Sequence, residues 1–231
     1  YTYSDKICLL SESYKNAFCQ FANITNMDNK LIAIPNPLSF EPDFSKEDLA
    51  KKQNIALVVG RLSEYEKRIS TILSVWSKFE KKYPQSDWTL KIVGNGISLN
   101  DYKRQAQDLH LKKCYFEGLQ NPVPYYKESS LFLMTSATEG FPMTLVEAQQ
   151  NGCVPIAMNS FLSITDIITH QRNGMIVNYG DKENFLKSMI YLMDNSQTLH
   201  RLAENALKDC QKYSQENIGT YWDKLFKDLR S

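Results

Sequence analysis

Short apolar runs alternate with amphipathic segments along most of the chain. Several runs, such as residues 55–60 (IALVVG) and 154–158 (VPIAM), are continuously apolar rather than alternating. Continuous runs are typical of strands that are covered on both faces, as in a parallel sheet. The pattern predicts strands at residues 6–10, 31–34, 55–60, 89–94, 114–118, 131–135, 154–158 and 175–178.

Between these runs, apolar residues recur at helical spacing and predict helices that face the core. The stripes consist of Ile69, Ile72, Leu73, Trp76 and Phe79; of Leu199, Leu202, Ala203, Ala206, Leu207 and Cys210; and of Ile218, Tyr221, Trp222, Leu225, Phe226 and Leu229. Ser214 precedes the last stripe and is predicted to cap its helix. Because strands and helices alternate, we expect an α/β fold with a doubly wound parallel sheet, which binds ligands beyond the carboxyl ends of its strands.

Composition narrows the class of protein. The chain has 231 residues, of which 42% are hydrophobic, and its 27 basic and 26 acidic residues leave a net charge of +1. This balance argues against a nucleic-acid partner, which requires a basic face. The three histidines are far apart and no D-x-D pattern occurs, so we expect no metal site. The five cysteines lack C-x-x-C spacing and are expected to be reduced, buried thiols of a cytoplasmic protein.

Arg61 and Lys67 stand out among the loops that follow the predicted strands. Arg61 comes directly after a strand, and Lys67 is predicted to open the next helix. Two cations in such a loop suit a diphosphate, because a guanidinium can bind two oxygens at once. The alternative is ordinary surface charge, since Glu64, Glu66 and Arg68 are close by.

Gly94-Asn95-Gly96 resembles half of the dinucleotide-binding fingerprint G-x-G-x-x-G. Leu99 stands in the place of the third glycine, and Glu117 follows about twenty residues later, where a ribose-binding acid would sit. A nicotinamide dinucleotide-binding domain is therefore one alternative, although the motif follows the second strand of the predicted sheet rather than the first. A G-x-G by itself mostly marks a tight turn where the backbone approaches a ligand or a helix.

Two acids, Glu139 and Glu147, are separated by seven residues in the run EGFPMTLVE. A helix is predicted to start between them, with Pro142 at its first position. The N–H groups of residues 143–145 then lack partners within the helix and, together with the helix dipole, form an anion site. Carboxylates beside an anion site suit a ligand with phosphate and hydroxyl groups, such as a sugar nucleotide. The alternative for Glu147 is an ordinary solvated glutamate on a helix.

Taken together, these stretches resemble the retaining glycosyltransferases of GT-B architecture, glycosyltransferase family 4 (group 1). Glu139 to Glu147 resembles the family's signature of two glutamates, and Gly60-Arg61-Leu62 with Lys67 resembles its phosphate element. The likeness runs from about residue 31 to the end. Several sequence blocks in the family's order indicate the family far more specifically than any single block does. Further blocks occur in the family's order at residues 92–96, 115–118, 147–148 with 152–155, and 173–177.

The resemblance implies a Rossmann-like domain that binds a nucleoside diphosphate sugar, with UDP as the expected nucleotide and no metal or other cofactor. Arg61 and Lys67 would hold the diphosphate and offset charge on the leaving group, while Glu139 would contact the donor sugar. Retention is expected to proceed by front-face attack, with the leaving phosphate helping to deprotonate the acceptor, and Glu139 is not assigned as a nucleophile. The donor contacts implied are Glu147 (to the ribose), Gly140, Phe141, Pro142, Met143, Thr144, Leu145, Gly94, Asn95, Gly96, Gly118 and Leu119.

The resemblance also divides the chain. It implies a remnant of the GT-B N-terminal domain at residues 1–37, a proline-containing linker at 38–54, the nucleotide-sugar-binding domain at 55–212, and a helix at 213–231 that would cross back to the N-terminal domain. Because most of the N-terminal domain and its acceptor site are missing, the fragment alone is expected to be inactive for transfer. The face of Trp222 and Phe226 would then be exposed or be covered by residues 1–37 or a second copy of the chain.

The expected full enzyme would transfer a hexose-type sugar to a glycan or lipid-linked acceptor in surface polysaccharide synthesis, in the cytoplasm or at the inner face of the membrane. One local departure from the family is Arg68, which stands where Gly often follows the lysine. Besides the dinucleotide-binding domain, a second alternative is a non-catalytic interaction module with a glycosyltransferase-like fold.

Overall fold

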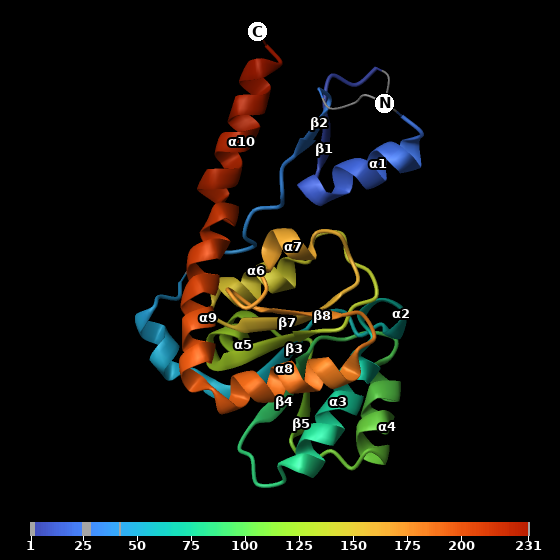
Figure 1. Ribbon diagram of the computed structural model, residues 1–231, viewed down its shortest axis with the longest axis vertical. Helices are drawn as coiled ribbons and strands as arrows, with labels where there is room; N and C mark the ends of the chain where they lie inside the picture. The colour runs from blue at the N-terminus through green and yellow to red at the C-terminus, as the bar shows by residue number, and fades with distance from the viewer. Residues whose placement is uncertain (1–2, 25–28, 42, 231) are drawn as a thin grey trace.

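The computed structural model describes residues 3–24, 29–41 and 43–230. Residues 1–2, 25–28, 42 and 231 belong to the predicted N-terminal remnant, linker and final segment, and those parts of the predictions lie outside the described residues. A six-stranded parallel sheet is covered by helices on both faces, and a two-stranded parallel sheet lies apart from it at one end of the molecule (Figure 1). The predicted α/β fold with a doubly wound parallel sheet is therefore confirmed.

The large sheet has the strand order β5-β4-β3-β6-β7-β8. The direction of the chain across the sheet reverses between β3 and β6, and ligands of open α/β sheets bind at such a point. All the strands expected from the apolar runs are present, with bounds β1 (Ile7–Leu9), β2 (Leu31–Ala33), β3 (Gln53–Val59), β4 (Thr89–Val93), β5 (Cys114–Gly118), β6 (Ser129–Met134), β7 (Val154–Asn159) and β8 (Met175–Asn178).

Strand β6 shows why the sheet carries helices on both faces. Each of its residues is buried. Leu131 and Leu133 belong to one apolar layer and Phe132 and Met134 to the other, because successive side chains of a strand point to opposite faces. The first layer includes α3 (Ile69–Lys82), α4 (Leu99–Asp108), α8 (Lys182–Asp194) and α9 (Ser196–Asp209), and the second includes α5 (Val123–Glu128), α6 (Met143–Gln150) and α7 (Ile164–Ile167).

The predicted core-facing stripes hold for the helices of the sheet domain. In α3 every residue of the stripe is buried, and in the α9 stripe Leu202, Ala203, Ala206 and Cys210 are buried. The remaining elements are α1 (Lys15–Ala22), α2 (Glu64–Lys67), α10 (Gln215–Asp228) and the short 3-10 turns η1 (Glu12–Tyr14), η2 (Glu47–Lys51) and η3 (Cys210–Tyr213).

The segment expected to be a linker packs on the sheet domain. Leu38 and Leu49 are buried, and the N–H of Leu38 donates to the carbonyl of Tyr213 at 2.8 Å. A Cβ at Gly152, which has φ +66, would lie 2.5 Å from Leu49. Glycine is therefore required where this segment crosses the end of α6, and the domain boundary at 38–54 stays a prediction.

Helix α10 extends from the sheet domain to the unit formed by β1, α1 and β2 (Figure 1). Ile218 and Leu225 are buried there against Ile34, which follows β2. The prediction that the whole α10 stripe faces the core is wrong, because the helix projects beyond the sheet and meets β2 with one side. The exposed members are Tyr221, Trp222, Phe226 and Leu229, with Trp222 and Phe226 stacked 5.8 Å apart. The predicted cap is confirmed, since the hydroxyl of Ser214 accepts from the N–H of Asn217 at 3.2 Å.

Burial of the cysteines differs from the prediction. Cys153 and Cys210 are buried, whereas Cys8 in the small sheet is exposed and Cys19 and Cys114 are half-buried. The small sheet has few elements packed on it, so a thiol on its strand reaches solvent.

Within the described ranges, no helix combines the length and the apolar character needed to cross a membrane.

Candidate active site

The loops singled out in the sequence meet at the carboxyl edge of β3, β4 and β6. The N–H of Leu62 donates to the carbonyl of Asn95 at 2.9 Å, and the N–H of Ala137 donates to the carbonyl of Glu66 at 2.7 Å. An open groove of about 780 Å³ lies here, and its lining includes Arg61, Glu66, Asn95 and Gly96. This volume is in the range of small-molecule sites.

Arg61 lines the groove and pairs with Glu66. Its Nη2 atom is 2.7 Å from each carboxylate oxygen of Glu66, and the Arg61 side chain is 68% exposed. An ion pair this exposed contributes only about 0–1 kcal/mol. A ligand carrying two phosphate groups can therefore replace Glu66 at little cost.

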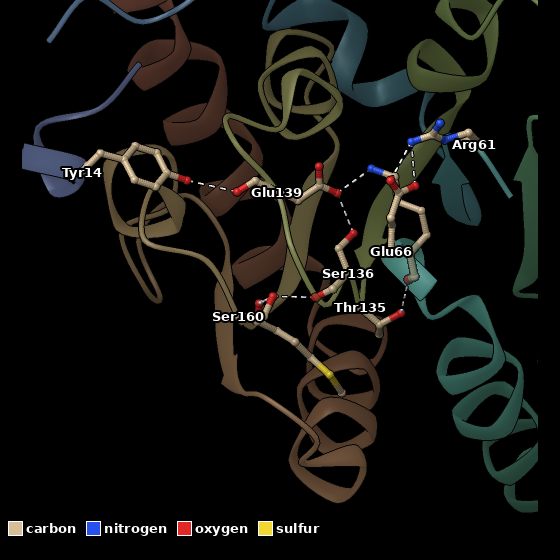
Figure 2. A network of polar contacts seen from close by, with 9 residues as sticks. Tyr14, Arg61, Glu66, Thr135, Ser136, Glu139 and Ser160 are labelled. Carbon is tan, nitrogen blue, oxygen red and sulfur yellow. Dashed lines mark hydrogen bonds and ion pairs between the residues drawn. The ribbon is translucent and has the colours of Figure 1, made fainter. Parts of the chain in front are cut away.

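Lys67 and Glu139 form the less exposed ion pair of the site. The Lys67 Nζ atom is 2.5 Å from Oε1 of Glu139, and the side chains are 22% and 12% exposed. The hydroxyl of Ser136 donates to the same Oε1 at 2.7 Å. Two residues predicted independently, 72 positions apart, are thus in direct contact, as Figure 2 shows for the Glu139 carboxylate and its neighbours.

The position of Lys67 differs from the prediction. It is the last residue of the one-turn helix α2, and α3 starts two residues later at Ile69. Between them Arg68 adopts a left-handed conformation with φ +52, which explains why glycine suits this position in the family that the sequence resembles. The hydroxyl of Thr135 donates to the carbonyls of Lys67 at 3.2 Å and Arg68 at 2.9 Å, and so ties this turn to the end of β6.

The glycines after β4 have a packing role. A Cβ at Gly94 would lie 1.9 Å from the carbonyl oxygen of Gly60, and one at Gly96 would lie 2.4 Å from that of Leu62. The half-fingerprint therefore reflects the close approach of two loops of the protein, and it needs no dinucleotide to explain it. The carbonyl of Gly118 accepts from the N–H of Gly94 at 2.7 Å, which adds the end of β5 to the same group of loops.

Helix α6 begins at Met143, and Pro142 is its N-cap with φ −73 and ψ 96. The prediction that Pro142 is the first helical residue is wrong by one position. Within the described part of the chain, the N–H groups of Gly140, Phe141, Met143 and Thr144 have no hydrogen-bond acceptor, whereas that of Leu145 donates to the carbonyl of Pro142 at 3.0 Å. Unpaired donors at the start of a helix favour an anion.

Gly140 leaves space beside these donors. It is exposed, its φ is not positive, and a Cβ there would meet nothing within 4 Å. Neither backbone strain nor packing therefore explains this glycine, in contrast to Gly94. The side chain of Phe141 anchors the loop between β6 and α6, because it is buried against Tyr213 with ring centroids 5.4 Å apart.

Glu147 is buried rather than solvated, so the surface alternative for this residue is wrong. The hydroxyl of Ser39 donates to its Oε1 at 2.5 Å, and that of Tyr126 donates to its Oε2 at 3.0 Å. Burial, and then the neighbouring carboxylate, raises the pKa of Tyr126 well above its usual range. A carboxylate that accepts hydrogen bonds from two hydroxyls has the chemistry needed to accept them from a diol.

Leu119 lies apart from this cluster. It is 78% exposed and follows β5, which is separated from β3 by β4. Sequence reasoning did not predict five of the residues labelled in Figure 2 as site residues: Tyr14, Glu66, Thr135, Ser136 and Ser160. The hydroxyl of Ser160 donates to the carbonyl of Ser136 at 2.5 Å.

Among the described residues there is no group of three or more His, Cys, Asp or Glu side chains arranged to hold a metal ion.

Comparisons with known proteins agree on one family. The model for glycosyl transferases group 1 matches residues 39–209. An uncharacterized glycosyltransferase of Haemophilus influenzae is 31% identical, over 96% of this chain and 61% of its own length. The amylovoran biosynthesis glycosyltransferase AmsD of Erwinia amylovora is 27% identical, over 97% of this chain and 63% of its own length. The chain thus spans less than two thirds of these relatives.

A solved structure has the same fold. HepE of Anabaena in complex with UDP superposes with a TM-score of 0.84 at 17% identity, covering 98% of this chain and 65% of its own. HepE has also been solved with UDP-glucose. The six-stranded parallel sheet is therefore that of GT-B glycosyltransferases. Because the model for glycosyl transferases group 1 matches most of the length of this chain, the chain belongs to the glycosyl transferases group 1 family.

Proposed function

We propose that the chain is the donor-binding portion of a retaining, metal-independent glycosyltransferase of family 4. In this proposal the donor is a nucleoside diphosphate sugar, with UDP as the nucleotide, and the acceptor is a glycan or a lipid-linked saccharide in surface polysaccharide synthesis. The observation that carries the proposal is the meeting of Lys67, Glu139 and the unpaired N–H groups of Gly140, Phe141, Met143 and Thr144 at one edge of the sheet.

Two ion pairs define what a donor must displace. Arg61 is held by Glu66, and Lys67 is held by Glu139. When a diphosphate binds, both cations would turn from carboxylates to phosphate oxygens. They would then stabilise the negative charge that develops on the departing nucleotide, which is electrostatic stabilisation by groups already in place. Glu139, released from Lys67, would accept hydrogen bonds from hydroxyls of the donor sugar.

The remaining donor contacts divide between the two ends of the ligand. The N–H groups of Met143 and Thr144, at the start of α6, would meet phosphate oxygens, and those of Gly140 and Phe141 would meet oxygens of the sugar. Glu147 would bind the ribose after exchanging the hydroxyl of Ser39, which lies on the surface segment, for a ribose hydroxyl. Gly118 and Leu119 would lie beside the base. Retention would follow from front-face attack, with the leaving phosphate assisting removal of the acceptor proton.

Calorimetric titration with UDP tests this function. We expect UDP to bind the wild-type chain, and the affinity to fall at least tenfold in the double variant with Arg61→Ala and Lys67→Ala, because two charge-assisted contacts to phosphate are lost. A double variant with Arg104→Ala and Lys78→Ala removes the same charge from exposed ion pairs elsewhere and should bind like the wild type. Failure of the wild type to bind UDP, other nucleoside diphosphates or their sugar conjugates would refute the proposal.

A further inference from the structure

One side chain of the N-terminal unit reaches the loop that carries Glu139. Tyr14 is half-buried and directly precedes α1. Its hydroxyl lies 3.0 Å from the carbonyl oxygen of Glu139 and 2.5 Å from that of Gly140. Figure 2 shows the Tyr14 ring approaching Glu139 from the side opposite Arg61. Because a phenol has a single O–H donor, the two carbonyls share it, and Gly140 also accepts from the hydroxyl of Ser163 at 2.8 Å.

The contact fixes the direction of two peptide groups. A trans peptide is planar, so the carbonyl of one residue and the N–H of the next point in opposite directions. With the carbonyls of Glu139 and Gly140 turned to Tyr14, the N–H groups of Gly140 and Phe141 point away from it. Figure 2 shows that the Glu139 carboxylate also points away from Tyr14. There it pairs with Lys67.

These two N–H groups are free to meet a ligand. Neither has an acceptor within the described ranges, and Gly140 has open space where a Cβ would stand. The groups that would bind the donor sugar, namely two N–H donors and one carboxylate, thus share one side of the loop. Tyr14 occupies the other side.

We infer that Tyr14 is a positioning residue for donor-sugar binding, an inference that rests on the proposed function. Through its hydroxyl it orients the peptide groups that follow Glu139 and Gly140. It lies outside residues 39–209, which match the family model. The N-terminal unit is held to the same side of the molecule by Ser11 and Ser13, whose hydroxyls donate to the carboxylate of Asp166.

The variant Tyr14→Phe tests the inference because it removes the hydroxyl and keeps the ring. Calorimetry would compare UDP with UDP-glucose, UDP-galactose and UDP-N-acetylglucosamine. We expect the tightest-binding sugar conjugate to bind about three- to tenfold more weakly, as for loss of one hydrogen bond, and the affinity for UDP to change less than twofold. The matched control Ser13→Ala removes a hydrogen bond from the same docking contact without touching the loop, and should leave both affinities within twofold of wild type.

A second measurement needs no ligand. Amide resonances of Gly140 and Phe141 report the hydrogen bonding of the preceding carbonyls, so Tyr14→Phe should shift their nitrogen frequencies and Ser13→Ala should not. Unshifted resonances, or equal weakening of UDP and its sugar conjugates, would overturn the positioning role. So would equal effects of the two variants. Failure of the wild type to bind any of these nucleotides would instead refute the proposed function, while shifted resonances would still show that Tyr14 orients the loop.

Discussion

The sheet domain and the N-terminal unit reach the candidate site by different physical means. The sheet domain places Arg61, Lys67 and Glu139 on segments that follow β3 and β6, and the central residues of both strands are buried between two continuous apolar layers. The unit of β1, α1 and β2 has strands of three residues and a helix without a buried residue. It is joined to the sheet domain by hydroxyls at Tyr14, Ser11 and Ser13 and by an apolar contact with α10.

This difference indicates which parts of the candidate site are held rigidly and which can adjust. Apolar layers resist any change of spacing, because a displaced core side chain loses its packing on all sides. Hydrogen bonds at a surface contribute about 1 kcal/mol each and can be exchanged. The cations and carboxylates of the site are therefore held by the rigid part, while the contact most open to movement is the one that orients the Glu139–Gly140 peptides.

The largest effect is expected from truncating the core of the sheet domain. Phe132 on β6 is 1% exposed and packs in the second apolar layer, so Phe132→Ala should lower the free energy of unfolding by about 3–5 kcal/mol. Phe21 on α1 is 82% exposed, and Phe21→Ala should change it by less than about 0.5 kcal/mol. Urea unfolding of both variants measures the contrast. Similar losses for the two would show that the N-terminal unit is packed as tightly as the sheet.

A smaller effect is expected at the buried hydrogen bond below the site. Tyr126→Phe leaves Oε2 of Glu147 without its hydroxyl donor. An unsatisfied buried acceptor costs about 1–3 kcal/mol, so the variant should unfold at a correspondingly lower urea concentration at neutral pH. Tyr125→Phe is the control, because Tyr125 donates to Glu117 at a partly exposed site and its loss should cost less than about 1 kcal/mol. Equal losses would contradict the assigned burial of Glu147.

The same tyrosine gives the protein an alkaline dependence of defined sign. Burial raises the pKa of Tyr126 above its ordinary value of 10.0. Above about pH 10 the unfolded chain loses this proton while the folded chain keeps it, so the free energy of unfolding falls as the pH rises. Tyr126→Phe should show a smaller fall than wild type between about pH 9 and pH 11 in urea unfolding. If the free energy of unfolding fell equally with pH in both proteins, the pKa of Tyr126 would not be raised in the folded state.

The smallest effect is expected at the turn that presents Lys67. Arg68 holds φ +52, which glycine adopts without strain, so Arg68→Gly should raise the free energy of unfolding by about 0.5–1 kcal/mol. Arg104→Gly, inside helix α4, should instead lower it by about 1 kcal/mol. Thermal unfolding of both variants measures the signs. Destabilisation by Arg68→Gly would show that the Arg68 side chain makes a contribution larger than the backbone strain.

The sequence allowed the sheet to be predicted because its strands are continuous apolar runs. It also indicated Arg61, Lys67, Glu139 and Glu147 as candidate site residues, since each stands at a strand end or near a helix start. The partners of Glu147 could not be read, because Ser39 lies 108 residues away and its contact depends on the path of the surface segment. The sequence left open whether Trp222 and Phe226 are exposed or covered, and the structure shows them exposed. Periodicity shows that a helix has an apolar side, but not which neighbour covers it.

In the proposed function a donor diphosphate binds between Arg61 and Lys67 by displacing Glu66 and Glu139. A crystal structure of the chain with UDP would show this. We expect phosphate oxygens within hydrogen-bond distance of both cations, with the Arg61–Glu66 and Lys67–Glu139 pairs opened. UDP bound with its diphosphate away from both cations, or with both ion pairs intact, would contradict it.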